Sequence, residues 1–110
     1  MFELRKRINR IKIKLSYHLR LSKVLGMPKS IVLEPTNHCN LKCPLCPTGR
    51  GDTSVPYGLF KLDKYKEVVD VISRWAQTVR LFAWGEPLLN KSFIKMIRYA
   101  SQNPYKIRTF

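Results

Sequence analysis

The sequence predicts an α/β fold with a parallel sheet, preceded by a basic amphipathic helix. Over residues 30–110, short apolar runs alternate with helical periodicities in the order β-α-β-α-β, which is typical of parallel strands joined by right-handed crossovers. Residues 1–29 differ, with nine basic residues against one acid. A composition of 45% hydrophobic and 25% charged residues is that of a globular protein. We therefore divide the chain into an extension, 1–29, and a core segment, 30–110.

The extension is expected to be one helix. Apolar residues recur at intervals of three and four from Leu4 to Leu19, and basic residues fill most of the remaining circumference, a pattern that predicts a narrow apolar stripe. We expect this stripe to pack on a neighbouring domain. The alternatives are contact of residues 1–25 with a membrane surface, an organellar transit peptide, and contact with nucleic acid. No apolar run reaches the roughly 18–20 residues of a membrane span.

The core segment opens with a buried strand and a long loop. The apolar run 31–33 predicts the strand, and the prolines and glycines of residues 35–58 predict the loop. A helix is expected from Asp63, its N-cap. One face of that helix is apolar: Tyr65, Val68, Val69, Ile72, Trp75 and Ala76.

A second strand-and-helix pair follows. The strand is expected over 79–84 and stops at Gly85-Glu86-Pro87. Asn90 is the expected cap of the next helix, and 106–110 begin a third strand. The apolar face of this helix comprises Phe93, Ile94, Ile97 and Ala100, and Phe82 has core-like spacing. A closed α/β barrel needs about 250 residues, so we expect these 110 residues to begin a larger fold.

All three cysteines lie in the loop after the first strand. Cys39, Cys43 and Cys46 are spaced C-x3-C-x2-C, and an odd count at such tight spacing argues against a disulfide framework. Ligands of parallel α/β sheets bind at the carboxyl ends of the strands, where this loop begins. Three thiolates can hold three irons of a [4Fe–4S] cluster and leave the fourth iron open. We therefore favour an iron–sulfur site in a reducing compartment.

Structural zinc is the main alternative for the cysteines. His38 would complete a Cys3His set, but adjacent residues such as His38 and Cys39 rarely reach one tetrahedral ion, and zinc sites usually pair separated C-x2-C units. A small zinc module that uses the net charge of +14 to bind nucleic acid or protein remains a second hypothesis. A non-catalytic remnant of a larger fold is a third. No specific nucleic-acid site is predicted, since the aromatic residues form no stacking platform.

With Glu34-Pro35-Thr36-Asn37 before it, the cysteine motif resembles that of the radical S-adenosylmethionine (radical SAM) enzymes. Within that family it is most similar to the group that often carries a SPASM or twitch domain. The resemblance covers roughly residues 30–110. It implies the beginning of a partial parallel (β/α) TIM-like barrel, in which Cys39, Cys43 and Cys46 each bind one iron. It also implies that the amino and carboxylate groups of SAM chelate the open iron. SAM is then reductively cleaved to a 5′-deoxyadenosyl radical that abstracts hydrogen from a substrate.

The resemblance implies further cofactor contacts. Leu45, just before the third cysteine, would lie against the adenine of SAM. Gly85, followed by Glu86 and Pro87, matches the family's Gly-Gly-Glu motif, whose backbone binds the methionine ammonium; Trp84 replaces the first glycine. The alternative for this tripeptide is a simple turn with Glu86 in water.

The partners implied are SAM, a substrate that the sequence does not identify, and an electron donor such as flavodoxin or ferredoxin. The expected location is the cytoplasm, with peripheral membrane contact as the alternative for the extension. The family's substrate pocket and remaining SAM contacts come from later strands. We therefore expect the 110-residue chain alone to bind a cluster weakly and to turn over substrate negligibly.

Overall fold

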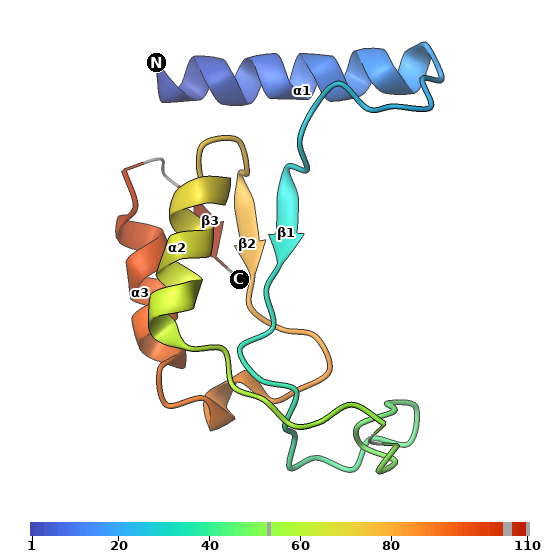
Figure 1. The fold of residues 1–110 in the computed structure, drawn as a ribbon, viewed down its shortest axis with the longest axis vertical. Helices are drawn as coiled ribbons and strands as arrows, with labels where there is room; N and C mark the ends of the chain where they lie inside the picture. Colours follow the sequence, from blue (N-terminus) through green and yellow to red (C-terminus); the bar gives the residue numbers. More distant parts are fainter. Residues whose placement is uncertain (53, 105–106, 110) are drawn as a thin grey trace.

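A computed structural model describes residues 1–52, 54–104 and 107–109 of the chain. A helix lies across one end of a short sheet, and two further helices pack along the sheet's side (Figure 1). The elements in chain order are α1 (Phe2–His18), β1 (Ser30–Val32), α2 (Leu62–Ile72), β2 (Thr78–Arg80), the 3₁₀ helix η1 (Pro87–Leu89), α3 (Phe93–Gln102) and β3 (Arg108–Thr109).

The sheet is parallel, with the strand order β1-β2-β3. Ile31 pairs with Val79, and Val79 pairs with Thr109. Because consecutive strands are neighbours, α2 and α3 return along the same side of the sheet (Figure 1). The predicted β-α-β-α-β order and the α/β fold class, the beginning of a partial (β/α) barrel, are confirmed.

The core lies between the sheet and these two helices. Tyr99 Oη donates a hydrogen bond of 2.7 Å to Asp70 Oδ1 across the α2–α3 contact, and this bond raises the pKa of Tyr99. The opposite face of the sheet leaves Val32 and Phe82 about half exposed. The buried apolar side chains are Tyr65, Val69, Ile72, Ala76, Val79, Leu81, Met96, Ala100 and Ile107.

Element boundaries differ from the sequence prediction in five places. The strand β1 is Ser30–Val32 instead of 31–33, and the N-cap of α3 is Ser92 rather than Asn90, which ends η1. The N-cap of α2 is Lys61 rather than Asp63; Asp63 lies in the first turn, where its carboxylate still favours the positive helix end. The second strand ends at Arg80 instead of residue 84, because its partner β1 ends opposite it at Val32. The third strand is Arg108–Thr109; residues 106 and 110 of the prediction lie outside the described residues.

Two apolar residues expected in the core are exposed instead. Ile94 points to solvent, whereas Met96 of the same helix is fully buried. The contacts of α3 with α2, and through β3 with the sheet, set this rotation, which the apolar periodicity alone does not fix. Phe82 is exposed because it follows the end of β2 and lies outside the core.

The helix of the extension is confirmed, but its apolar stripe does not face the rest of the described chain. Lys6, Asn9 and Ser16 are the buried residues of α1. Asn9 Nδ2 donates to the Met27 carbonyl (2.8 Å), and Asn9 Oδ1 accepts from the Met27 N–H (2.7 Å). These paired bonds turn the polar side inward, where burial lowers the pKa of Lys6.

Replacing Tyr65 by phenylalanine tests the polarity of the core. Among the described residues, the Tyr65 hydroxyl is buried without a hydrogen-bond partner, so Tyr65→Phe should be neutral or stabilising by up to about 1 kcal/mol at pH 7. Burial raises the pKa of Tyr65 from 10.0 to about 12. The folded state therefore holds this proton while the unfolded state loses it, and wild-type stability should fall as the pH rises from about 10 through 12.

Urea unfolding at pH 7 and pH 11 measures both effects. Tyr65→Phe should lose less stability than wild type between the two pH values, and the exposed Tyr17→Phe should behave as wild type. A loss above about 1 kcal/mol at pH 7 for Tyr65→Phe would show that the hydroxyl is hydrogen-bonded.

Candidate functional site

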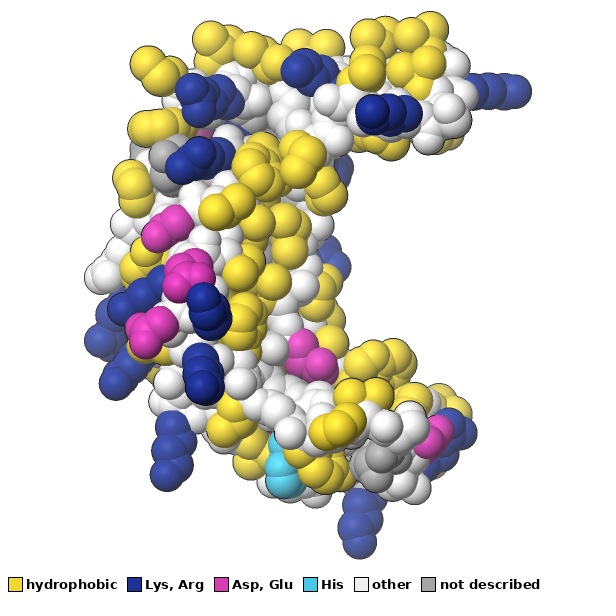
Figure 2. All heavy atoms as spheres, in the orientation of Figure 1, with side chains coloured by type: hydrophobic (Ala, Val, Ile, Leu, Met, Phe, Trp, Pro, Cys, Tyr) yellow, Lys and Arg dark blue, Asp and Glu magenta, His cyan; other side chains and the backbone are white. Residues whose placement is uncertain are grey.

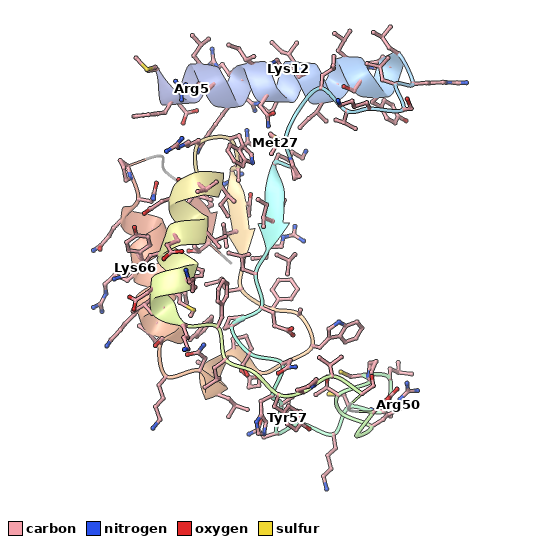
Figure 3. The ribbon with its side chains drawn as sticks, viewed as in Figure 1. Arg5, Lys12, Met27, Arg50, Tyr57 and Lys66 are labelled. Carbon is pink, nitrogen blue, oxygen red and sulfur yellow. The ribbon has the colours of Figure 1, made fainter. Side chains whose placement is uncertain are left out.

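The cysteine loop begins where β1 ends, so the sheet positions it. Figure 3 places this part of the chain, marked by Arg50 and Tyr57, at the end of the molecule opposite α1. All three thiols are free; Cys43 is exposed, and Cys39 and Cys46 are half-buried. The Cys46 N–H donates to the Cys43 carbonyl at 3.1 Å. The second and third cysteines therefore share one tight turn.

A glycine allows this turn to fold back on itself. A Cβ placed on Gly49 would lie 2.6 Å from both the nitrogen and the carbonyl oxygen of Cys43, closer than real side chains approach. The absence of a side chain at Gly49 thus lets the chain pass directly over the second cysteine.

The three cysteines fit a cluster by their chemistry and their position in the fold. Three thiols on one loop are the donor set of a cluster with three protein ligands, and the Leu41 N–H points at Cys39 Sγ at 3.5 Å, a contact of the kind that tunes such clusters. Among the residues that the structure describes, no three His, Cys, Asp or Glu side chains are placed to hold a metal ion. Because thiolates repel one another without a counter-charge, the turn must close around a cluster in order to hold it.

His38, the extra ligand of the zinc alternative, packs against another ring. Its imidazole stacks on Tyr57, with ring centroids 4.6 Å apart and 23° between planes. Its backbone N–H donates to Thr36 Oγ1 at 3.1 Å. These contacts support a role in shaping the loop.

The Gly85-Glu86-Pro87 loop lies beside the cysteine loop because Glu34, at the start of the cysteine loop, binds its backbone. Glu34 Oε1 accepts hydrogen bonds from the N–H groups of Trp84 (2.6 Å) and Gly85 (3.0 Å). The Glu86 N–H donates to the His38 carbonyl at 2.8 Å. Residues some fifty positions apart in the sequence thus meet at the carboxyl edge of the sheet.

Gly85 is required by close packing. A Cβ at this position would overlap the carbonyl oxygen of Thr36 and lie 2.9 Å from the Asn37 Cα, and Thr36 is itself buried. Its neighbours have structural contacts: Glu86 Oε1 accepts from the Leu88 N–H (3.2 Å) as the cap of η1, and Pro87 is the first residue of that helix. One carboxylate oxygen of Glu86 therefore caps η1 at the protein surface.

Two asparagines hold the surrounding loops. The Asn37 side chain donates to the Pro56 carbonyl (2.9 Å) and accepts from the Gly58 N–H (2.7 Å). Asn90, expected only as a helix cap, accepts from the Ser92 N–H and also donates to the carbonyls of residues 35 and 60 at 2.8 and 3.1 Å. Sequence reasoning assigned no role to Glu34 or Asn37. The available signal was their position as polar residues directly after the apolar run 31–33. The strand was expected to be buried, but Ser30 and Val32 are exposed and Ile31 is half-buried, because the second helix layer that would cover its other face is not among the described elements.

A cavity separates the cysteine loop from the Gly85 loop. Its volume is about 350 Å³, and Glu34, Asn37, Pro47 and Trp84 are among the residues that line it, a size in the range of small-molecule sites, about 300–1,000 Å³. Leu45 stands apart with 93% of its surface exposed. Trp84, next to Gly85, and Pro47, next to Cys46, therefore line one cavity, while Leu45 points to solvent.

Comparison with known proteins supports the predicted family. No protein-family model matches the chain. It is 27% identical over 86 residues to a PqqA peptide cyclase of Rhodopseudomonas palustris, covering 74% of this chain and 22% of that protein. It is 31% identical over 74 residues to an AdoMet-dependent heme synthase of Methanosarcina barkeri (67% and 21%). It is 34% identical over 84 residues to a GTP 3′,8-cyclase of a Synechococcus strain (76% and 22%).

A solved structure shares the fold. The crystal structure of BtrN in complex with AdoMet and 2-DOIA superposes with a TM-score of 0.65 and 23% identity, covering 76% of this chain and 35% of that one. These relatives are radical SAM enzymes, and the chain is related to that family, as the cysteine motif predicted. The chain spans about a fifth of the length of the curated relatives it matches.

Adding one methyl group at Gly85 should disrupt the contact between the two loops. Gly85→Ala forces the Thr36 backbone to move, so we expect a loss of about 1–3 kcal/mol in the free energy of unfolding. Gly58→Ala is the matched control, because a Cβ there meets no atom within 4 Å. Urea unfolding measures both variants, and equal stabilities would contradict the packing described.

Removing the Glu34 carboxylate should free the Gly85 loop. Glu34→Ala leaves two N–H groups without their acceptor, and we expect a loss of about 1–3 kcal/mol together with faster hydrogen exchange at the Trp84 and Gly85 amides. Glu34→Gln, which keeps an acceptor oxygen, should recover part of the loss. The control is Glu67→Ala, which removes only an exposed ion pair with Lys64, worth less than about 1 kcal/mol. Unchanged exchange at both amides in Glu34→Ala would show that the carboxylate does not hold this loop.

Proposed function

We propose that this chain supplies the cluster-binding and SAM-binding part of a radical SAM enzyme. The observation that carries the proposal is the meeting of two sequence motifs at one sheet edge. The C-x3-C-x2-C loop follows β1, the Gly85 loop follows β2, and Glu34 joins them through two hydrogen bonds. Ligand sites of parallel α/β folds lie at this edge.

Cys39, Cys43 and Cys46 would hold three irons of a [4Fe–4S] cluster. When bound and reduced, that cluster supplies the electron that cleaves SAM to methionine and a 5′-deoxyadenosyl radical. The remaining work of the chain is to bind, orient and shield the reactants. The turn at Gly49 and the Cys46–Cys43 hydrogen bond keep two of the thiols on one short segment, which favours closure around a cluster.

The Gly85 loop would position the methionine end of SAM. Glu34 already accepts the N–H groups of Trp84 and Gly85, which fixes the loop without using its carbonyl oxygens in this contact. Carbonyl oxygens are the groups that accept hydrogen bonds from an ammonium. Leu45, exposed on the cysteine loop, would offer apolar contact to the adenine. Glu86 and Pro87 would support the loop as the start of η1.

The electron donor would be a flavodoxin or a ferredoxin. The excess of basic residues in 30–110 favours an acidic donor through electrostatic attraction. The three free thiols favour a reducing compartment, the cytoplasm.

Reconstitution with iron and sulfide without oxygen tests the proposal. The wild-type chain, which we expect to bind a cluster weakly, should still turn brown with excess iron and sulfide. It should show the electron paramagnetic resonance signal of a reduced [4Fe–4S] cluster and change that signal when SAM is added. Cys43→Ala should lose most of the bound iron, because two thiols hold the cluster poorly. Leu59→Ala, at an exposed apolar residue of the same loop, should keep it.

Other outcomes would contradict parts of the proposal. Colourless protein with one zinc per chain would favour the zinc module, and equal iron in Cys43→Ala and wild type would remove the cysteine assignment. We expect negligible 5′-deoxyadenosine from the 110-residue chain. Rapid formation of this product would show that later barrel strands are not needed.

A further inference from the structure

The apolar stripe of α1 lies on the outside of the molecule. Leu4, Ile8, Ile11 and Leu15 are 60%, 44%, 63% and 46% exposed, whereas Lys6, Asn9 and Ser16 are at most 8% exposed. At 3.6 residues per turn, the centre of the stripe lies about 140° around the helix from the centre of the buried side. The helix thus presents to solvent the face that an amphipathic helix ordinarily packs on its protein.

Specific hydrogen bonds fix this orientation. Besides the paired Asn9–Met27 bonds, Ser16 Oγ accepts from the Leu25 N–H at 2.9 Å and donates to the Lys12 carbonyl at 2.7 Å. A Cβ on Gly26 would lie 2.7 Å from the Ile13 side chain and 3.0 Å from the Asn9 carbonyl oxygen. The segment after α1 therefore binds the polar side of the helix closely, and the stripe cannot turn inward without breaking these contacts.

Basic side chains border the stripe on both flanks. Arg5 and Lys12 lie about 80° to one side of its centre, and Arg7 and Lys14 lie about 80° to the other. All four are exposed, and Glu3 is the one acidic residue of the helix. Hydrophobic side chains follow the outer edge of α1 with basic side chains beside them (Figure 2), and Figure 3 shows Arg5 and Lys12 on this helix.

We propose that α1 lies on the surface of a membrane that contains anionic lipid. Such a surface supplies hydrocarbon for the stripe and phosphates for both rows of cations, and a helix with this division of faces lies in the interface plane. None of the helices in the described ranges has the length and apolar character needed to cross a membrane.

Charge favours a lipid surface over the other occupants. A neighbouring protein domain, the occupant expected from the sequence, would have to bring acidic side chains to the exposed cations on both sides of the stripe. A second copy of α1 packed stripe to stripe would bring its cations against those of the first, at an electrostatic cost. Nucleic acid would neutralise the cations but leave the four apolar side chains in water. Leu19, the C-cap of α1, is also exposed and continues the stripe at the spacing of Leu15.

Flotation of the chain with lipid vesicles tests the proposal. The chain should float with phosphatidylcholine vesicles that contain phosphatidylglycerol, and the bound fraction should fall without that anionic lipid or at high salt. Ile8→Glu/Ile11→Glu should reduce binding at least about tenfold. The matched control is Val71→Glu/Ile94→Glu, which places the same charges at exposed apolar positions of α2 and α3 and should reduce binding far less.

A charge variant independently tests whether the basic side chains of α1 bind anionic lipid. Lys12→Gln/Lys14→Gln should weaken binding to the anionic vesicles about tenfold or more, and Lys91→Gln/Lys95→Gln, exposed residues near and on α3, should have a smaller effect. Circular dichroism checks that each variant keeps its helices.

Three outcomes would overturn the proposal. The first is a wild-type chain that stays with the soluble fraction; the second is equal loss of binding in the α1 pair and in the control pair. The third is a preference for another occupant. Concentration-dependent dimerisation that Ile8→Glu/Ile11→Glu abolishes would identify a second copy, and tight RNA binding that this variant retains would identify nucleic acid.

Discussion

One carboxylate joins the two halves of the candidate site. Glu34 stands just after β1 and accepts the N–H groups of Trp84 and Gly85, just after β2. The strands β1 and β2 pair over only three residues. So short a pairing does not by itself fix the direction of the long loops that follow the strands. The carboxylate, together with the close packing of Gly85 on Thr36, fixes how the cysteine loop and the glycine loop face each other. The cavity between the two loops therefore depends on the Glu34 hydrogen bonds and on the contact of Gly85 with Thr36.

The parallel α/β fold was predictable because its strands and helices alternate with clear apolar periods. The cysteine motif is read directly in the sequence, and three thiols at short spacing favour a metal or cluster site; that assignment stays a prediction. The rotation of α3, which buries Met96 instead of Ile94, was not predictable, since it depends on contacts with elements distant in sequence. The same holds for Glu34, whose partners are some fifty residues away.

The extension shows a different limit of sequence patterns. The periodicity of α1 correctly predicted a helix and its stripe, but not the side that touches the chain. Asn9 and Ser16 decide that side by bonding backbone groups of residues 25–27. A polar residue on a helix gives no sign in sequence that its partner is a backbone amide nine or eighteen positions later. Hydrophobic periodicity therefore shows that a helix has an apolar and a polar face, and individual hydrogen bonds decide which of the two packs against the chain.

The helix α1 and the cysteine loop lie at opposite ends of a molecule whose longest dimension is 43 Å (Figure 1). With α1 resting on lipid, the cysteine end stands tens of ångströms from the headgroups, several times the roughly 8 Å over which physiological salt screens charge. The negative bilayer would then not repel an acidic redox protein arriving at that end. Polar molecules would reach and leave that end through the aqueous phase, while the chain itself diffuses only in the plane of the bilayer.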